Sequence, residues 1–225
     1  MFSNSNGGFL MKNFILTLLT IFFASCNVLA HECNSSTECA IMGKKLIEQK
    51  EYKNAIECFT KAIEMDENEY FSYAFRAKAN YYLKNYDQTI KDADKSIEIN
   101  PNSVAYGIKS SVNLLKGNYN DAINNSTKAL ELNPQYMKCY EVRARAELAT
   151  ENYVDALKDS TKAINLRNDY AKSYEVRAKA YAGIKDYISA TQDCEKAAAL
   201  FKNNHDRKNA RQMKKLAKCY KGKIK

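Results

Sequence analysis

The sequence predicts an all-α protein, a right-handed α-solenoid of antiparallel helix pairs that ends in a C-terminal capping helix. Three observations predict this fold: a short phrase that recurs with a fixed period, a helical spacing of apolar residues between its copies, and a basic amphipathic segment after the last copy. A fixed period of about 20 to 50 residues is typical of stacked copies of one supersecondary unit.

Five tyrosines set the period. Tyr52, Tyr86, Tyr119, Tyr153 and Tyr187 stand 34, 33, 34 and 34 residues apart, and each lies at the start of a phrase such as EYKNAIECFTKAIEM. A small residue follows three positions after each tyrosine and a second one seven positions later: Ala55 and Ala62, Thr89 and Ser96, Ala122 and Ala129, Ala156 and Ala163, Ala190 and Ala197. Seven residues make two helical turns, so both small residues lie on one face, where a neighbouring helix can approach closely.

A second amphipathic stretch precedes each tyrosine. In SYAFRAKANYYL, Tyr73, Ala77 and Asn80 fall at i, i+4 and i+7, which is a helical pattern. The link to the tyrosine phrase is short and polar (KN, GN, EN or KD), and only an antiparallel helical hairpin fits so short a link. Pro101 and Pro134, the only prolines, stand just after the second helix of their repeats, where proline stops a helix.

This pattern resembles the tetratricopeptide repeat. The small residue that the family has in its first helix corresponds to Gly43, Ala77, Ser110, Ala144 and Ala178. Five repeats follow, at residues 36–69, 70–102, 103–136, 137–170 and 171–204. The chain departs from the family in lacking the early Trp, and in lacking the closing proline in repeats one, four and five. The resemblance implies a scaffold that binds a protein or peptide partner in a concave groove.

The resemblance also implies which residues line that groove. Positions 2, 5, 9 and 12 of each repeat share one face of the first helix because their spacings are 3, 4 and 3. The expected groove residues are Lys44, Phe71, Lys78, Tyr81, Ser111, Leu114, Lys138, Glu141, Arg145, Lys172, Glu175 and Lys179. A groove with an apolar middle and alternating Lys and Glu toward its carboxyl end suits an extended or helical peptide.

Three repeats have an arginine directly before the small residue: Arg76, Arg143 and Arg177. This phrase resembles the tetratricopeptide domains of Hsp70/Hsp90 co-chaperones, which hold a terminal carboxylate with Lys, Asn and Arg side chains. The Asn expected before the arginine is Phe75, Val142 or Val176 here, so that clamp is absent in every repeat frame. A co-chaperone module therefore stays a minor alternative.

No enzyme chemistry is indicated. His31 and His205 are the only histidines, and no His–Cys or His–Ser–Asp arrangement can be built within the repeats. The sequence has no GxGxxG, no phosphate-binding loop and no CxxC. Carboxylates such as Asp92 and Asp94 are expected on a solvated helix face. We expect a non-catalytic protein that needs no cofactor or metal.

The amino terminus predicts export. Met11-Lys12-Asn13 precedes a ten-residue run, Phe14–Phe23, in which eight residues are apolar and two are threonine. Val28-Leu29-Ala30 has the small residues that signal peptidase prefers, so residues 1–30 are interpreted as a signal peptide with 1–10 as an over-extended start. The apolar run is too short to span a membrane as a helix. A second interpretation stays open, since Phe23-Ala24-Ser25-Cys26 resembles a bacterial lipoprotein box and lipidation at Cys26 would anchor the protein to a membrane. Soluble export, periplasmic or secreted, ranks first because the box has Phe where Leu is usual.

Export implies an oxidising compartment. Six cysteines remain after cleavage at Ala30: Cys33, Cys39, Cys58, Cys139, Cys194 and Cys219. Cys33 and Cys39 are close enough in sequence to form a disulfide across the start of the first helix. Because repeats contact only their neighbours, Cys58, Cys139 and Cys194 are expected to be small core residues.

The positive charge is concentrated in the tail. Residues 202–225 contain ten Lys or Arg and one acid, a net charge of +9 that equals the formal charge of the whole chain. Apolar residues recur there at helical spacing (Ala210, Met213, Ala217, Tyr220 and Ile224), and a basic face lies beside them (Arg207, Arg211, Lys214, Lys218 and Lys221). We expect residues 205–225 to cover the last repeat. The basic face also predicts contact with an anionic membrane surface or an acidic partner. Nucleic acid is not expected as a partner, because export separates the two.

Overall fold

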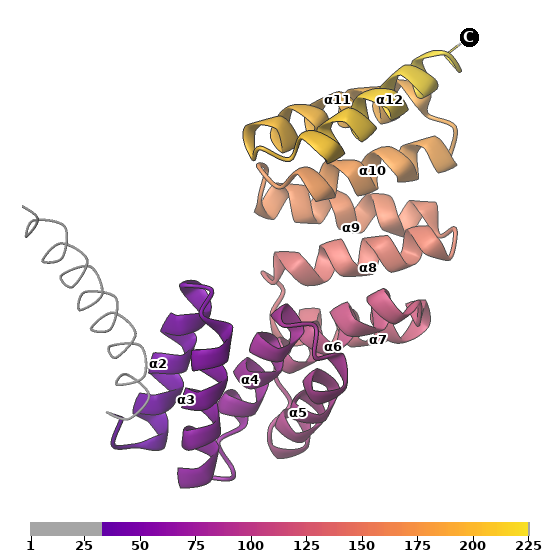
Figure 1. Cartoon of the computed structure of the whole chain (residues 1–225). Helices are drawn as coiled ribbons and strands as arrows, with labels where there is room; N and C mark the ends of the chain where they lie inside the picture. Colours follow the sequence, from indigo (N-terminus) through magenta and orange to yellow (C-terminus); the bar gives the residue numbers. More distant parts are fainter. Residues whose placement is uncertain (1–32, 225) are drawn as a thin grey trace, which may run out of the picture.

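The computed structural model of the chain describes residues 33–224. This part holds eleven helices and no strand, arranged as consecutive antiparallel pairs (Figure 1). The pairs are α2 (Ser36–Glu48) with α3 (Tyr52–Met65), α4 (Tyr70–Tyr82) with α5 (Tyr86–Ile99), α6 (Ser103–Lys116) with α7 (Tyr119–Leu132), α8 (Met137–Ala149) with α9 (Tyr153–Leu166), and α10 (Ala171–Gly183) with α11 (Tyr187–Asn203). A single helix, α12 (Arg207–Lys221), follows. The predicted all-α solenoid is confirmed, while the expected signal peptide and Cys26 lie outside the described residues.

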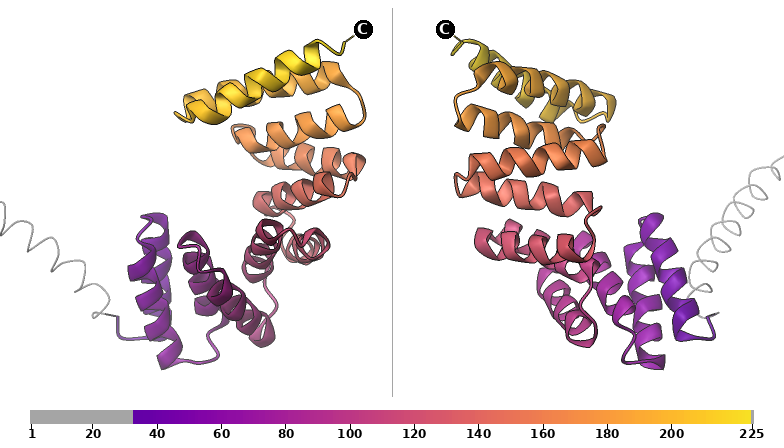
Figure 2. Two further views of the ribbon diagram at one scale, coloured as in Figure 1. Left: turned by 45° about the vertical axis from the view of Figure 1, so that its right-hand side comes forward. Right: turned by 180° about the vertical axis from the view of Figure 1, so that it is seen from behind.

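Each helix pair packs against the next one along the chain, so the molecule is an elongated stack (Figure 2). In both views of Figure 2 the pairs at the amino-terminal end are turned relative to the pairs from α8 onward, which curves the stack. In such a stack each repeat is stabilised by its neighbours rather than by one central core.

Small residues make the close packing possible. All ten small residues of the tyrosine phrases, from Ala55 to Ala197, are fully buried. In the first helix of repeat one the small residue is Gly43, and a Cβ there would lie 2.7 Å from the ring of Phe59. That is too close for two carbon atoms, so glycine at this position leaves the space that the fully buried Phe59 ring occupies.

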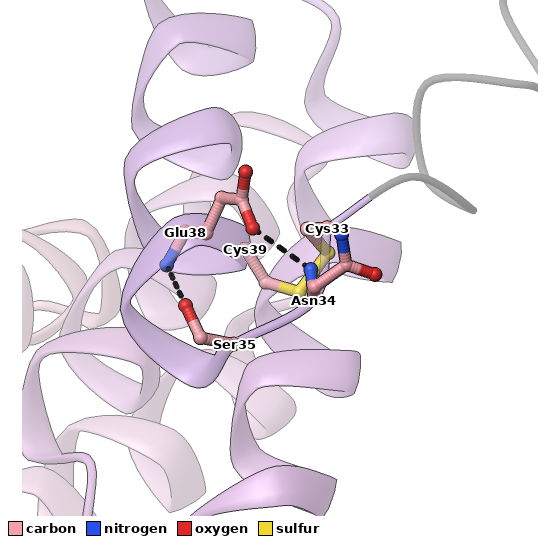
Figure 3. The surroundings of a disulfide bond; sticks show 5 residues. All are labelled: Cys33, Asn34, Ser35, Glu38 and Cys39. Carbon is pink, nitrogen blue, oxygen red and sulfur yellow. Dashed lines mark hydrogen bonds between the residues drawn. A yellow bond between two sulfur atoms is a disulfide. The ribbon is translucent and has the colours of Figure 1, made fainter.

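The first turn of α2 is fixed by a disulfide and two capping hydrogen bonds (Figure 3). Cys33 and Cys39 are joined, with their Cα atoms 5.2 Å apart. The backbone N–H of Glu38 donates to Ser35 Oγ at 3.2 Å, and the Glu38 carboxylate accepts from the N–H of Asn34 at 2.8 Å. This arrangement is close to a capping box, in which a Ser and a Glu three residues later satisfy free backbone donors of the helix start.

Three arginines connect neighbouring repeats, in contacts that we call arginine junctions. Each arginine donates two hydrogen bonds of 2.5 to 3.0 Å to an aspartate in the second helix of its own repeat. Its remaining nitrogen donates to a threonine of the preceding repeat at 2.9 to 3.5 Å. The three sets are Arg76 with Asp92 and Thr60, Arg143 with Asp159 and Thr127, and Arg177 with Asp193 and Thr161.

The prediction that Asp92 lies on a solvated face is wrong. Its exposed fraction is only 3%, because the bidentate contact with Arg76 compensates for its loss of water. Asp94 is half exposed. It pairs with a lysine of repeat three, and that repeat has no arginine junction. There Lys109 takes the arginine's position and bonds to Asp94 of the preceding repeat.

Helix α12 covers the end of the stack. Ala210, Met213 and Ala217 are buried against the cluster that contains Phe201 of α11. Tyr220 is partly buried and stacks on Tyr187 with the ring centroids 6.2 Å apart. Ile224 does not share this face as expected: it is 42% exposed, because the helix ends at Lys221. None of the helices within residues 33–224 has the length and apolar character needed to span a bilayer.

Candidate functional site

Nine of the twelve expected groove residues line two neighbouring cavities on the first helices of the repeats. One cavity lies between α4, α6 and α8, and the other lies between α8 and α10. We call them the aromatic pocket and the charged pocket. Helix α8 contributes to both, so the two cavities are adjacent along the stack.

The aromatic pocket has a volume of about 360 Å³. Its lining consists of Lys78, Tyr81, Tyr82, Ile108, Ser111, Tyr136, Met137, Lys138, Arg167 and Tyr170. Four tyrosines with Ile108 and Met137 give an apolar wall, and three cations are added to it without any lining carboxylate. Such a cavity accepts a large apolar side chain and favours negative charge nearby.

The pKa values of the two lysines in this pocket are shifted in opposite directions. Burial lowers the pKa of Lys78, and the positive charge of Lys44 lowers it further. Burial also acts to lower the pKa of Lys138, but Glu141 and Tyr170 outweigh it, so the net pKa is raised and Lys138 stays charged. Burial raises the pKa of Tyr81, Tyr82 and Tyr136, so their hydroxyls remain neutral.

The charged pocket has a volume of about 330 Å³. Its lining consists of Glu141, Arg145, Leu148, Ala149, Lys172, Glu175, Val176 and Lys179. Glu141 is fully buried, and its two carboxylate oxygens accept from Lys138 and from Arg145, the latter at 3.3 Å. Glu175 accepts from Lys179 at 2.5 Å. Lys172 is exposed and forms no ion pair or hydrogen bond through its side chain within the described residues.

Three expected groove residues lie outside both pockets. Phe71 packs on Phe75 with the ring centroids 4.3 Å apart, as part of the amino-terminal core. Lys44 is exposed on α2, near enough to Lys78 to affect its charge. Leu114 is partly buried on α6.

The sequence reasoning missed the residues that the inter-repeat loops bring into the aromatic pocket. Tyr136 precedes α8, and Arg167 and Tyr170 precede α10. Tyr136 and Tyr170 stand 34 residues apart, so the repeat period itself marks them. They were missed because only positions on the first helices were considered.

The arginines of the co-chaperone-like phrase do not line either pocket. Arg76, Arg143 and Arg177 are occupied in the arginine junctions, at hydrogen-bond distance from buried aspartates. Their guanidinium groups hold the stack together instead of facing a ligand.

The remaining predicted residues lie near the two ends of the chain. Arg207, Arg211, Lys214, Lys218 and Lys221 are all exposed on α12, and within the described residues their side chains form no ion pair. Cys58, Cys139 and Cys194 are buried free thiols, and Cys219 is an exposed one. Within residues 33–224 no group of three or more His, Cys, Asp or Glu is placed to hold a metal ion.

Comparison with known sequences identifies the repeat. A family model described as tetratricopeptide repeat matches residues 39–69 and 104–136. The small glutamine-rich tetratricopeptide repeat-containing protein 2 of Saccharomyces cerevisiae is 40% identical over 62 residues, which are 28% of this chain and 18% of that protein. The protein STIP1 homolog of Dictyostelium discoideum is 28% identical over 74 residues, 33% of this chain and 13% of that protein. The match thus spans less than a fifth of either relative.

Solved structures agree on the fold. A MamA structure from Desulfovibrio magneticus has a TM-score of 0.62 at 16% identity and covers 76% of this chain and 97% of its own. YrrB, described as a TPR protein with an unusual peptide-binding site, has a TM-score of 0.61 at 16% identity and covers 80% of this chain and 92% of its own. The two matched segments are tetratricopeptide repeats, and the same helical hairpin recurs five times in phase within residues 33–224, so the described part of the chain has a tetratricopeptide-type solenoid fold.

Proposed function

We propose that the chain is a non-catalytic scaffold that binds a peptide segment of a partner protein in the groove formed by the aromatic and charged pockets. The observation that supports this most is the gathering of nine groove residues, named from the family resemblance and the repeat phase, around two adjacent cavities. Stacked helical repeats form extended concave binding surfaces, and YrrB, which has the same fold, is described as having a peptide-binding site, which supports peptide binding by this chain.

Peptide selection tests the proposal. Peptides selected from a random display library on the full chain should lose at least about tenfold in affinity for a Lys78→Glu, Lys172→Glu double variant, since both lysines line the pockets. The matched control is Lys162→Glu with Lys196→Glu, two exposed lysines on the second helices, which should leave affinity unchanged. Selected peptides that bind the pocket variant as tightly as wild type would contradict the proposal.

A second candidate is attachment to an anionic membrane surface through α12. Within residues 33–224 its five exposed cations form no ion pair, and Ile188 and Ile224, both exposed, lie in one shallow hollow with Lys185, Lys223 and Asp186. Cations beside exposed isoleucines suit the boundary between headgroups and acyl chains. Co-sedimentation with phosphatidylserine vesicles should be lost in a Lys214→Glu, Lys218→Glu variant and should weaken with salt. Unchanged sedimentation of that variant would exclude this role for α12.

Export belongs to the proposal as well. The intact mass of the mature protein separates cleavage at Ala30 from a lipid on Cys26, because the two products differ in their first residue and in the added acyl mass. A mature chain that still begins at Met1 or Met11 would remove the basis for both interpretations.

The co-chaperone alternative is not favoured. The arginines that prompted it are engaged with Asp92, Asp159 and Asp193. Releasing one of them to a ligand would leave a buried carboxylate without its partner, which is costly.

A further inference from the structure

We infer that the groove selects an extended acidic segment with two anchors about three residues apart, a large apolar or aromatic side chain for the aromatic pocket and a carboxylate for the charged pocket. This inference rests on the proposed function and adds the chemistry and spacing of the partner.

The aromatic pocket has apolar surface that nothing in the described chain covers. Tyr82 is 46% exposed although it is a large aromatic residue, and it faces the same cavity as Ile108, Met137 and Tyr170. Exposed aromatic surface inside a concave site is typical of a binding position. An apolar side chain of the partner would cover it and exclude water.

The cations around this pocket specify the charge of the partner. Lys78 lies over the ring of Phe75 and Arg167 over the ring of Tyr170, with 5.4 and 5.1 Å to the ring centroids. Arg167 also contacts Asp169, but both side chains are more than half exposed, so this pair is weak. With no carboxylate in the lining, a basic segment would be repelled and an acidic one attracted.

The charged pocket offers donors that the protein itself does not use. Its two carboxylates already accept from the chain's own cations, Glu141 from Lys138 and Arg145, and Glu175 from Lys179. Within the described residues the Lys172 ammonium forms no ion pair or hydrogen bond, although Asp206 is near enough to interact with its charge, and the further N–H groups of Arg145, whose side chain is 40% exposed, are also open. A carboxylate of the partner is the complement of these donors, because charge-assisted hydrogen bonds to Arg and Lys are among the strongest.

Helix α8 sets the spacing between the two anchors. Lys138 lines the first pocket and Arg145 lines the second, and both bond to Glu141 between them. Seven residues of helix rise about 10 Å. An extended chain in the polyproline II conformation advances about 3.1 Å per residue and brings every third side chain to the same face, so it spans that distance in about three residues with both anchors toward the groove. A helical partner would need about seven residues instead.

Fluorescence polarisation with labelled peptides and the full chain tests the inference. The probe has a Phe-Ala-Ala-Glu core in neutral flanks, made in both chain directions, and the better direction is used throughout. It should bind at least about tenfold tighter than probes with Phe→Ala or with Glu→Gln. In Lys172→Glu protein the preference should invert, so that a Phe-Ala-Ala-Lys probe binds better, while Lys162→Glu protein should keep the wild-type preference.

The possible failures are distinguishable. If probes ending in Glu, Gln and Lys bind wild type equally while library-selected peptides still require Lys78 and Lys172, the acidic preference is overturned and the proposed function stands. If a probe with six residues between Phe and Glu binds tightest, the extended spacing is overturned. If selected peptides ignore the pocket variant altogether, the proposed function and this inference both fail.

Discussion

At the scale of single residues, the Arg143 guanidinium forms ion pairs with two buried carboxylates. Its Nε lies 2.5 Å from Asp159 and 3.9 Å from Glu147. Repeat two has an amide at the position of Glu147, where Asn80 donates to Asp92 at 3.4 Å. Glu147 has no such proton to donate when it is ionised, and its second oxygen has no hydrogen-bond partner in the described structure. Burial, and then the charge of Asp159, raises the pKa of Glu147 to about 8.

Replacing Glu147 by Gln should therefore stabilise the protein in a pH-dependent way. The folded state holds this proton more tightly than the unfolded chain, whose carboxyl has a pKa near 4.5. Stability is lost as pH rises from about 4.5 to about 8, and the cost is fully present above that. We expect Glu147→Gln to gain about 1 to 2 kcal/mol at pH 8 and little at pH 4.5, measured by urea unfolding.

The charged residues around Glu147 also affect its pKa. Asp159 and Asp155 act to raise its pKa, and Arg143 and Lys158 act to lower it. They are the same in both proteins, so the difference between wild type and Glu147→Gln isolates Glu147. An exposed carboxylate on α7, Glu131, provides the control through Glu131→Gln. A gain that is constant with pH would argue that packing, not ionisation, is responsible.

At the scale of elements, the turn inside each helix pair has one residue in the left-handed region. It stands two positions before the repeat tyrosine: Lys50, Lys84, Gly117, Glu151 and Lys185, with φ between 60 and 81°. Side chains with a Cβ adopt this region at a cost of roughly 1 kcal/mol, which only glycine avoids. Four of the five turns therefore contain a strained residue.

Exchanging residues between these turns should change stability in opposite directions. Gly117→Ala should cost about 1 kcal/mol even though a Cβ there would meet no atom within 4 Å, because the strain lies in the backbone at φ 81°. Lys84→Gly should gain a few tenths of a kcal/mol, since relief of strain outweighs the extra freedom of the unfolded chain. Thermal unfolding measures both. Equal midpoints for wild type and Gly117→Ala would show that this turn can change its conformation freely.

The arginine junctions act between elements, and their removal should be costly. Arg143→Ala leaves Asp159 buried without its bidentate partner, so we expect a loss of about 3 kcal/mol in urea unfolding. Arg167→Ala removes an arginine whose partner Asp169 is 69% exposed, and it should cost less than about 0.5 kcal/mol. Similar losses for the two variants would mean that Asp159 gains water when Arg143 is removed.

At the scale of the whole molecule, the stack ends where α12 covers the apolar face of α11. Met213 is 1% exposed at the centre of that contact. In a solenoid each repeat is stabilised mainly by its interfaces with the neighbouring repeats. A substitution that weakens the cap should therefore destabilise the last repeat most and more distant repeats progressively less.

Met213→Asp should therefore unfold the last repeat first. A buried unpaired carboxylate costs several kcal/mol, and we expect amide exchange to rise across α10–α12 while α2 and α3 stay protected. Lys214→Asp changes charge at the exposed neighbouring position and should leave exchange unchanged. Uniform loss of protection along the chain would indicate that all five repeats unfold as one cooperative unit.

The repeat period allowed much of this protein to be predicted. Once the tyrosines give the phase, the small residues that pack and the side chains that share the groove face follow from helical geometry, and nine of those side chains line the two pockets. The period could not show that Asp92 is buried, because a polar residue on a helix says nothing of what packs over it. Tyr136 and Tyr170 share the repeat period, but like Arg167 they precede the first helices, so the spacing of residues along a helix face does not place them in the groove.

By itself the sequence determined the local architecture: which segments are helices, how they pair and which faces meet, since these depend on spacings of three, four and seven residues along one chain. Only the tertiary structure decided how polar groups are used. Arg143 and Arg145 are two residues apart on one helix, yet the first is engaged with buried Asp159 and the second lines an open pocket. The physical reason is that the energy of a charge depends on its neighbours and on access to water, which depend on contacts between distant segments.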